Sequence, residues 1–352
     1  MIREGFWRNR RVFITGHTGF KGGWLAHWLT ILGAKVYGYA LNSSNELDFF
    51  QATNLLDKLE GSTIGDIRDL DLLKKSVLSS NPEIVIHMAA QSLVRRSYSD
   101  PLNTFSTNLI GILNLLDAIM YSENVRAVIN VTTDKCYENN GAAWPFRECD
   151  PLGGRDPYSA SKACAEIASA SYRDSFLTDR GIHLANVRAG NVVGGGDQAQ
   201  DRLIPDFYRS VRSGIKIKIR SPSSVRPWQH VLEPICGYMM LAERLFNNET
   251  KFIGPWNFGP ERRDERSVQW VISKLCNSNP QMSWDIDQAE KPHEADILRL
   301  DSSKSQLVLG WFPKWNIDKT LEKTDYWYVS QLNGLDVSKI TTEQINQYKE
   351  IH

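Results

Sequence analysis

Short apolar runs alternate with helix-length segments through the first half of the chain, and this alternation limits the folds that it can adopt. A strand, a helix and a second parallel strand form a βαβ unit, in which helices cover both faces of the sheet. The sequence therefore predicts a doubly wound, Rossmann-like α/β fold with a parallel sheet. We expect strands at Arg11–Thr15, Lys35–Ala40, Glu83–Ala90, Ala127–Thr133 and in a run ending near Arg188, and helices near Lys21–Leu32, Leu70–Ser79, Leu102–Ala118 and Tyr158–Phe176.

The texture of the sequence changes after residue 190, where turn-rich pieces and scattered tryptophans replace the regular alternation. This change predicts a second, smaller α/β domain. The segment Arg226–Phe246 reads as one further helix that packs on the first sheet, so the second domain need not be contiguous. We expect residues 1–190, together with about 226–258, in the first domain and residues 191–225 and 259–352 in the second.

Charge and cysteine content exclude several classes of protein. The 352 residues carry 41 lysines and arginines against 41 aspartates and glutamates, so no net charge favours nucleic acid or an anionic membrane. The five cysteines are widely spaced and odd in number, which favours a reducing compartment, and no spacing is typical of a metal site. The N-terminus lacks the apolar core of a signal peptide, and no run approaches the ~18 apolar residues of a membrane span. We therefore expect a soluble, cytoplasmic protein without a metal.

The first predicted strand leads directly into the sequence TGHTGFKGG, which opens the first predicted helix. Its glycines, Gly16, Gly19 and Gly22, follow the spacing G-x-x-G-x-x-G. Here the first glycine permits a tight turn, the second lets the backbone approach a pyrophosphate and the third allows close helix packing, while the helix N-terminus offers free N–H groups. A glycine-rich turn without a ligand is the alternative, but the strand before and the helix after favour a dinucleotide site.

The end of the second predicted strand bears on the choice between NAD and NADP. NAD sites usually carry an acid there, which binds the adenosine ribose. Asn42 takes that position, and no basic residue next to it would attract a 2′-phosphate, so we expect NAD. In the segment GDIRD, Asp66 is placed either to contact the adenine or, like Asp69, to cap a helix.

The segment YSASK supplies a candidate acid–base pair. Tyr158 and Lys162 are four residues apart, so a helix places both side chains on one face. A lysine beside a phenol lowers the pKa of the phenol and can also hold a nicotinamide ribose, and the tyrosine then becomes a usable general base. The pattern is common by chance, but its place after a dinucleotide-binding half makes it significant.

Together these motifs resemble the extended short-chain dehydrogenase/reductase family. The matching stretches, in family order, are TGHTGFKG, GDIRD, HMAAQ, TNLIGILNLL, VTTDKCY, YSASK, VRAGNVVGGGD and RPWQHVLEP. Within the family, GHTGFKGGW, TTDKCY, AGNVVGGGD and RPWQHV are most similar to the nucleotide-sugar 4,6-dehydratases that act on CDP-glucose. The resemblance implies an NAD-retaining lyase that converts CDP-glucose to CDP-4-keto-6-deoxyglucose for bacterial deoxysugars, such as those of the lipopolysaccharide O-antigen.

The resemblance also implies cofactor contacts and an assembly. Members of the family commonly dimerise through helices beside the active site, which here are those near residues 102–118 and 158–176. We therefore expect a homodimer or homotetramer. By position in the family motifs, NAD contacts come from Gly16, Thr18, Gly19, Phe20, Gly22, Asn42, Asp66, Ile67, Ala89, Ala90, Gln91, Thr132, Tyr158 and Lys162.

For Asp134 and Lys135, which lie side by side after a predicted strand, the resemblance implies a second acid–base pair. In such dehydratases the tyrosine takes the proton of the sugar 4-hydroxyl while carbon 4 is oxidised. By position, Lys135 then removes the proton of carbon 5, Asp134 protonates the departing 6-hydroxyl, and Thr133 bonds the 4-oxygen. Related dTDP-glucose enzymes carry glutamate in place of Lys135, and a lysine must lose its proton before it acts as a base. A salt-bridged surface pair is the alternative.

Substrate contacts are implied at the start of the second region. Asn191 and Arg226 match the family positions that reach the diphosphate of the nucleotide sugar, and the fork of an arginine suits a bidentate phosphate contact. A surface position beside its neighbouring proline is the alternative for Arg226. Arg202, His293 and Arg299 are further candidates whose alignment with the family is weaker.

Other functions are compatible with parts of this sequence. A 4-epimerase needs no acid and base beyond Tyr158 and Lys162, so the Asp134–Lys135 pair counts against it. Dehydratases of dTDP-glucose or UDP-N-acetylglucosamine share the chemistry; the latter can carry an Asp-Lys pair, though many lack the tyrosine. A non-catalytic dinucleotide-binding module would be expected to have lost Tyr158 or Lys162, and both are present.

Overall fold

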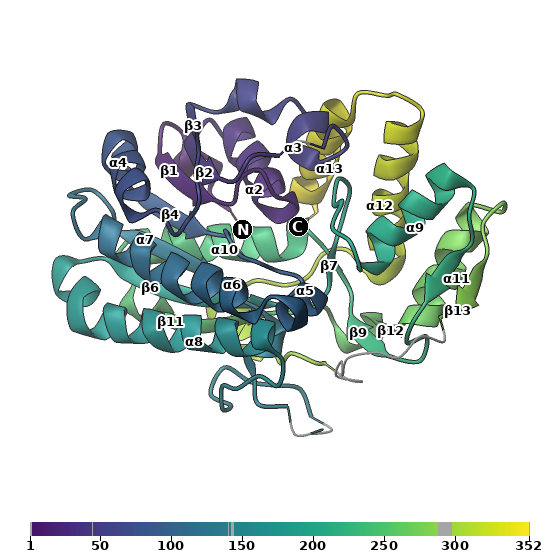
Figure 1. The fold of residues 1–352 in the computed structure, drawn as a ribbon. Helices are drawn as coiled ribbons and strands as arrows, with labels where there is room; N and C mark the ends of the chain where they lie inside the picture. The colour runs from purple at the N-terminus through teal and green to yellow at the C-terminus, as the bar shows by residue number, and fades with distance from the viewer. Residues whose placement is uncertain (1, 44, 140, 142–143, 288–297, 352) are drawn as a thin grey trace.

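The computed structural model describes residues 2–43, 45–139, 141, 144–287 and 298–351. Within these residues a parallel sheet of seven strands forms the centre of the molecule, in the order β11-β6-β5-β4-β1-β2-β3 (Figure 1). The chain runs outward in one direction from β1 to β3 and in the other from β4 to β11, so the predicted doubly wound parallel fold is confirmed. The strands are β1 (Arg11–Thr15), β2 (Lys35–Ala40), β3 (Gly61–Ile64), β4 (Ile84–His87), β5 (Ala127–Val131), β6 (His183–Ala189) and β11 (Gly254–Phe258).

Two hydrophobic cores lie on opposite faces of this sheet, because alternate residues of a strand point to opposite sides. Val12 and Ile14 face one core, which α2 and α10 cover, whereas Phe13 faces the other, which α4, α7 and α8 cover. The α-helices are α1 (Glu4–Trp7), α2 (Phe20–Ile31), α3 (Phe49–Ala52), α4 (Leu70–Ser80), α5 (Val94–Ser99), α6 (Pro101–Phe105), α7 (Gly111–Ile119), α8 (Pro157–Tyr172), α9 (Leu203–Ser213), α10 (Leu232–Phe246), α11 (Val268–Ser278), α12 (Ile317–Leu332) and α13 (Val337–Glu350).

The structure departs from the sequence predictions in several elements. The predicted helix Arg226–Phe246 is wrong in its first turns, since α10 begins only at Leu232. Pro227 cannot donate a helical hydrogen bond and disfavours a helical residue before it, and the chain there forms β9 (Val225–Pro227) and β10 (Gln229–His230). The predicted helix near 102–118 is divided by a π-helical turn, η2 (Ser106–Ile110). The edge strand β3 was not expected, because its sequence GSTI is short and only half-buried.

In its described residues, the second region contributes short strands and the helices α9, α11, α12 and α13. β7 (Val192–Val193) pairs with β10, β8 (Ile217–Ile219) with β13 (Trp284–Ile286), and β9 with β12 (Glu265–Ser267). Near the C-terminus, α13 returns to pack on α2, and the yellow and purple ends of the chain lie side by side (Figure 1). The division of the chain into two domains stays a prediction.

The parallel arrangement brings four connections to one edge of the sheet. The carboxyl ends of β1, β4, β5 and β6 lie next to one another, and the chain leaves them through the glycine loop and through residues 88–91, 132–135 and 190–191. Open α/β sheets bind ligands at this edge, where the strand order reverses. In the described part of the chain, no helix combines the length and the apolar character that a membrane span requires.

The contact between α2 and the glycine loop makes Gly22 sensitive to an added methyl group. A Cβ at Gly22 would lie 2.1 Å from the carbonyl oxygen of Gly16. Both atoms are fixed by the backbone, so no side chain can rotate to relieve the clash. We expect Gly22→Ala to lower the free energy of unfolding by about 2 kcal/mol, measured by urea unfolding. Gly5→Ala is the control, because nothing lies within 4 Å of the added methyl in α1. Equal stability of the two variants would contradict the expectation.

Candidate active site

A cavity of about 740 Å³ opens at the carboxyl edge of the sheet, between the sheet and the second region. It collects side chains from connections that are far apart in the sequence. With the exception of Asn42 and Arg299, every described residue that the sequence predicts for the site lines this cavity. These residues are Gly16, Thr18, Gly19, Phe20, Gly22, Asp66, Ile67, Ala89, Ala90, Gln91, Thr132, Thr133, Asp134, Lys135, Tyr158, Lys162, Asn191, Arg202 and Arg226.

Three predicted residues are not brought to the cavity or cannot be placed. Asn42 is exposed just beyond β2, and the neighbouring Leu41 lines the cavity instead. The guanidinium of Arg299 donates a hydrogen bond to Glu265 over 2.7 Å. His293 lies outside the described residues.

The glycine loop has the shape that a pyrophosphate site requires. Gly16 has a φ of +80°, and a Cβ there would lie 2.8 Å from the backbone nitrogen of Ala89. Gly19 is the N-cap of α2, and it provides no side chain to bond the N–H groups of the first helical turn. These N–H groups and the positive end of the helix are therefore available to an anion.

Asp66 and Asp69 follow β3, and the structure gives the two carboxylates different partners. Asp69 caps α4, because its carboxylate accepts a hydrogen bond from Leu72 N over 3.0 Å. Asp66 instead pairs with Arg68, at 2.5 Å from Nη2, and hydrogen bonds from Arg68 lower the pKa of Asp66. Asp66 therefore presents an ionised carboxylate at the cavity wall.

Tyr158 and Lys162 lie on the first turns of α8, which begins at Pro157 and is capped by Asp156 through Ser159 N. The ammonium of Lys162 donates to the carbonyl of Val131 over 3.1 Å, and burial lowers its pKa to about 8. The pKa of Tyr158 is raised to about 12 by burial, although a hydrogen bond with Thr133 and the charge of Arg202 act in the opposite direction. The sequence prediction of a lowered pKa for Tyr158 is wrong here, because desolvation of a phenolate outweighs the neighbouring cations.

Asp134 and Lys135 project differently from a short 3₁₀ turn, η3 (Asp134–Cys136). Asp134 is buried: Oδ1 accepts a hydrogen bond from Thr133 Oγ1 over 3.1 Å, and Oδ2 has no partner among the described residues. Lys135 is partly exposed, with Nζ 3.9 Å from Asp134 Oδ1. The salt-bridged pair that the sequence left open is thus present, although Asp134 itself is buried. Its unpartnered oxygen belongs to a group that can reach a ligand in the cavity.

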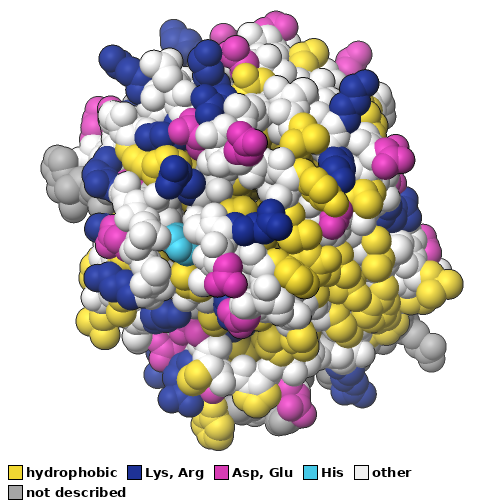
Figure 2. All heavy atoms as spheres, turned by 90° about the vertical axis from the view of Figure 1, so that its left-hand side faces the viewer, with side chains coloured by type: hydrophobic (Ala, Val, Ile, Leu, Met, Phe, Trp, Pro, Cys, Tyr) yellow, Lys and Arg dark blue, Asp and Glu magenta, His cyan; other side chains and the backbone are white. Residues whose placement is uncertain are grey.

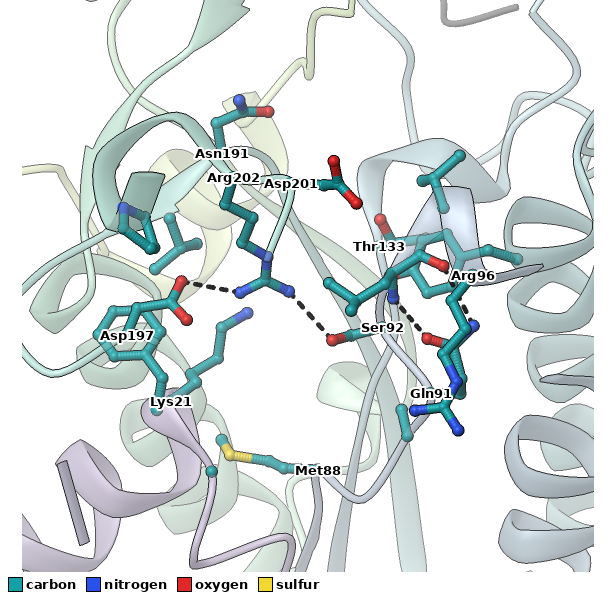
Figure 3. A pocket seen from close by; sticks show the side chains of 18 of the residues that line it. Lys21, Met88, Gln91, Ser92, Arg96, Thr133, Asn191, Asp197, Asp201 and Arg202 are labelled. Carbon is teal, nitrogen blue, oxygen red and sulfur yellow. Dashed lines mark hydrogen bonds and ion pairs between the residues drawn. The ribbon is translucent and has the colours of Figure 1, made fainter. Parts of the chain in front are cut away.

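The cavity wall is strongly basic although the whole chain has no net charge. Among the described residues, ten lysines and arginines line the cavity against five aspartates. Sequence reasoning missed several of them, among them Lys21, Arg95 and Arg220. In Figure 3, Lys21 and Arg202 point into the same space, where Arg202 is held by Asp197 over 2.9 Å and by Ser92 over 3.0 Å. The available signal for Lys21 was a charged residue inside the glycine motif.

The sequence of the chain is similar to that of known proteins. The sequence profile of the GDP-mannose 4,6 dehydratase family matches residues 13–324. The chain belongs to this family. A CDP-glucose 4,6-dehydratase of Salmonella typhimurium (strain LT2) is 46% identical to it over 354 residues, which cover 99% of this chain and 98% of the relative. A dTDP-glucose 4,6-dehydratase of Xanthomonas campestris is 25% identical over 343 residues, which cover 90% of this chain and 92% of that protein.

Solved structures with the same fold include nucleotide-sugar dehydratases and nucleotide-sugar epimerases. A dTDP-glucose 4,6-dehydratase double mutant from Streptomyces venezuelae, with NAD bound, superposes with a TM-score of 0.76 at 22% identity and covers 93% of this chain and 99% of its own. A UDP-glucose 4-epimerase from Stenotrophomonas maltophila, also with NAD, superposes with a TM-score of 0.80 at 18% identity and covers 92% and 99%. These similarities show the fold that the family shares.

The environment of Lys21 yields a test of the site electrostatics. Burial, Arg202 and Lys162 lower the pKa of Lys21 from 10.5 to about 8, while Asp134 raises it. Below pH 8 the side chain of Lys21 is therefore charged in the folded protein, although the charge is more stable in the unfolded chain, where water surrounds it. We expect Lys21→Met to raise the free energy of unfolding at pH 7 by about 1 kcal/mol, because the desolvated charge is removed. The gain should shrink as the pH rises from about 8 towards 10.5, measured by urea unfolding.

The control for this measurement is Lys75→Met, which removes an exposed lysine of α4. It should leave the dependence of stability on pH as in the wild type. A Lys21→Met protein that is no more stable than the wild type at pH 7 would contradict the assignment.

Proposed function

We propose that the protein converts CDP-D-glucose to CDP-4-keto-6-deoxy-D-glucose by internal redox chemistry through bound NAD. The observation that carries this proposal is that Asp134 and Lys135 share one cavity with Tyr158 and Lys162. One pair suffices to oxidise an alcohol, whereas the elimination of water needs a further base and acid. The similarity to the Salmonella CDP-glucose 4,6-dehydratase, 46% identity over 99% of the chain, supports CDP-glucose as the substrate.

The residues at the glycine loop fit NAD. The uncapped N-terminus of α2 suits a pyrophosphate, and Gly16 and Gly22 leave no room for a side chain between loop and helix. Asp66 carries an ionised carboxylate where the adenosine half would lie, and Lys162 would hold the nicotinamide ribose. When bound, NAD supplies an acceptor that takes a hydride from carbon 4 of the sugar and returns it to carbon 6.

Three side chains carry the proton transfers in this proposal. Tyr158 accepts the proton of the 4-hydroxyl, and Thr133 and Arg202 offset part of the burial that opposes its ionisation. The ketone at carbon 4 then acidifies carbon 5, from which Lys135 removes the proton. Asp134, with one unpartnered carboxyl oxygen, protonates the departing 6-hydroxyl.

The basic wall of the cavity suits two diphosphate groups. A dinucleotide and a nucleotide sugar bring several negative charges into one space, and ten lysines and arginines against five aspartates can balance them. We assign Asn191, Arg202 and Arg226 to the sugar nucleotide, because they line the cavity and come from the chain after β6, whereas the glycine loop supplies the dinucleotide site. Residues 191–225 and 259–352 would thus form the substrate-binding domain, and residues 1–190 with about 226–258 the NAD-binding domain.

Two alternatives account for less of the site. A 4-epimerase leaves Asp134 and Lys135 without a task, although the fold is the same. A dinucleotide-binding module leaves the basic wall beyond the glycine loop without a ligand. The same dehydration of dTDP-glucose or UDP-N-acetylglucosamine differs only in the nucleotide, and the test below distinguishes the three substrates. We place the reaction in the cytoplasm of a bacterium, in the synthesis of deoxysugars for surface polysaccharides such as the O-antigen.

An apolar face indicates how copies of the chain would associate. Figure 2 shows hydrophobic side chains gathered on the side of the molecule that carries α7 and α8. Exposed apolar residues of α6, η2 and α8, which pack together, include Leu102, Ile110 and Ile167, and Phe176 follows in η4 (Arg173–Leu177). A contiguous apolar surface of this kind is typical of a protein interface. We propose a homodimer through these helices, alone or within a homotetramer.

The reaction is tested with purified protein and CDP-glucose in deuterated water, without added NAD. We expect a 4-keto-6-deoxy sugar with deuterium at carbon 5, detected by NMR. Lys135→Ala should retain NAD binding but form product at least about 100-fold more slowly, because no other group removes the proton of carbon 5.

Three outcomes would revise the proposal. Turnover of dTDP-glucose or UDP-N-acetylglucosamine in place of CDP-glucose would correct the nucleotide. Full turnover by Lys135→Ala would refute the role of Lys135. No product from any of the three substrates, with NAD supplied, would favour a binding module.

The interface is tested by Ile167→Arg, whose parent side chain is 59% exposed on α8. We expect the wild type to sediment as a dimer or larger at micromolar concentration and the variant to sediment as a monomer, because a buried unpaired charge opposes association. Leu307→Arg is the control, since Leu307 is 84% exposed in η8 (Ser305–Leu309), a separate element. A monomeric wild type would refute the interface.

A further inference from the structure

Glu166 is a buried acid that the proposed reaction does not use. It lies on α8, four residues after Lys162 and eight after Tyr158, and its side chain is 2% exposed. Its carboxylate forms a two-point ion pair with Arg188 of β6, in which Arg188 Nε donates to Oε1 over 2.8 Å and Nη2 donates to Oε2. The arginine is equally buried. This ion pair lies behind the segment that carries Asp134 and Lys135.

Both ends of that segment are tied to the ion pair. On one side, Thr132 Oγ1 donates to Glu166 Oε1 over 2.6 Å, and on the other, Cys136 Sγ donates to the same oxygen over 3.4 Å. One residue further, the hydroxyl of Tyr137 accepts from Arg188 Nη1 over 2.6 Å. The three residues between these ties, Thr133 to Lys135, line the cavity, as does Thr132 itself.

The energetics favour a positioning role for this ion pair over a purely stabilising one. Removing two charges from water offsets most of their attraction, and apolar packing of the same volume is often at least as stable. A fully hydrogen-bonded carboxylate is, however, rigid and directional. A single carboxylate that bonds both flanks of Thr133–Lys135 and belongs to the helix of Tyr158 and Lys162 fixes the two reactive pairs relative to each other.

We propose that Glu166, held by Arg188, is a positioning residue that sets Asp134 and Lys135 against the sugar. This inference rests on the proposed function. Oxidation at carbon 4 depends first on Tyr158 and Lys162, which α8 carries directly, and of the tied segment only Thr133 assists it. The removal of water depends on the tied segment. Loss of Glu166 therefore slows the elimination and spares the oxidation.

The test compares Glu166→Gln with Ser169→Ala. Ser169 lies one turn further along α8 and accepts a hydrogen bond from Asn130 of β5 over 3.0 Å, so its loss removes a buried helix-to-strand contact without touching Glu166. Because Glu166 also favours the protonated form of Lys162, whose pKa is about 8, both variants are assayed at a pH about 1.5 below that value.

In Glu166→Gln we expect reduced nicotinamide to form from CDP-glucose at a rate within about threefold of the wild type and to accumulate, while product formation falls at least about tenfold and KM changes by less than about threefold. Amide hydrogen exchange of residues 132–137 should rise about tenfold, because the segment has lost a tie on each side. Ser169→Ala should change none of these quantities.

The proposal is overturned if oxidation and elimination fall together, if neither rate nor exchange changes, or if Ser169→Ala shows the same pattern. A wild type that does not convert CDP-glucose would contradict the proposed function instead, and the exchange measurement would still decide the role of Glu166. If Glu166→Gln does not fold, the double variant Glu166→Met with Arg188→Met, which leaves no buried charge unpaired, is expected to give the same separation.

Discussion

Burial of the central sheet on both faces is the constraint on which the rest of the structure depends. Helices cover the apolar side chains above and below every inner strand, so polar and charged groups are displaced to the ends of the strands. Because all seven strands are parallel, their carboxyl ends meet at one edge. Residues as distant in sequence as Gly16, Asp134 and Asn191 thereby line one cavity. The site follows from the topology before any particular side chain is considered.

Burial also sets the electrostatics of the cavity. It raises the pKa of Tyr158 and lowers the pKa values of Lys21 and Lys162, so each group is shifted towards its neutral form. A cavity wall with an excess of cations attracts anionic ligands, and such ligands would in turn favour the charged forms of these lysines. The protonation states of Lys21 and Lys162 therefore depend on the ligand that is bound. The buried Glu166–Arg188 pair lies behind this wall and supplies fixed geometry there.

Much of the fold and of the site could be predicted from the sequence, for reasons that are local. The bounds of β1 and β2 agree with the prediction because their apolar runs end at turns. The glycine loop and the Tyr158–Lys162 pair have fixed spacings that allow few geometries. By contrast, β3 has no apolar pattern, and the extent of α10 was decided by one proline. Contacts between distant residues leave no local pattern, and this explains why Arg220 and the ties of Glu166 were not predicted.

The central claim is that one cavity both removes a hydride from carbon 4 and returns it to carbon 6. CDP-glucose labelled with deuterium at carbon 4 tests it most directly. The account predicts a product that carries the label at carbon 6, with none released to the solvent, when the reaction is followed by NMR and mass spectrometry. Product with unlabelled carbon 6, or label that is lost to added unlabelled NAD, would contradict an internal redox cycle in this cavity.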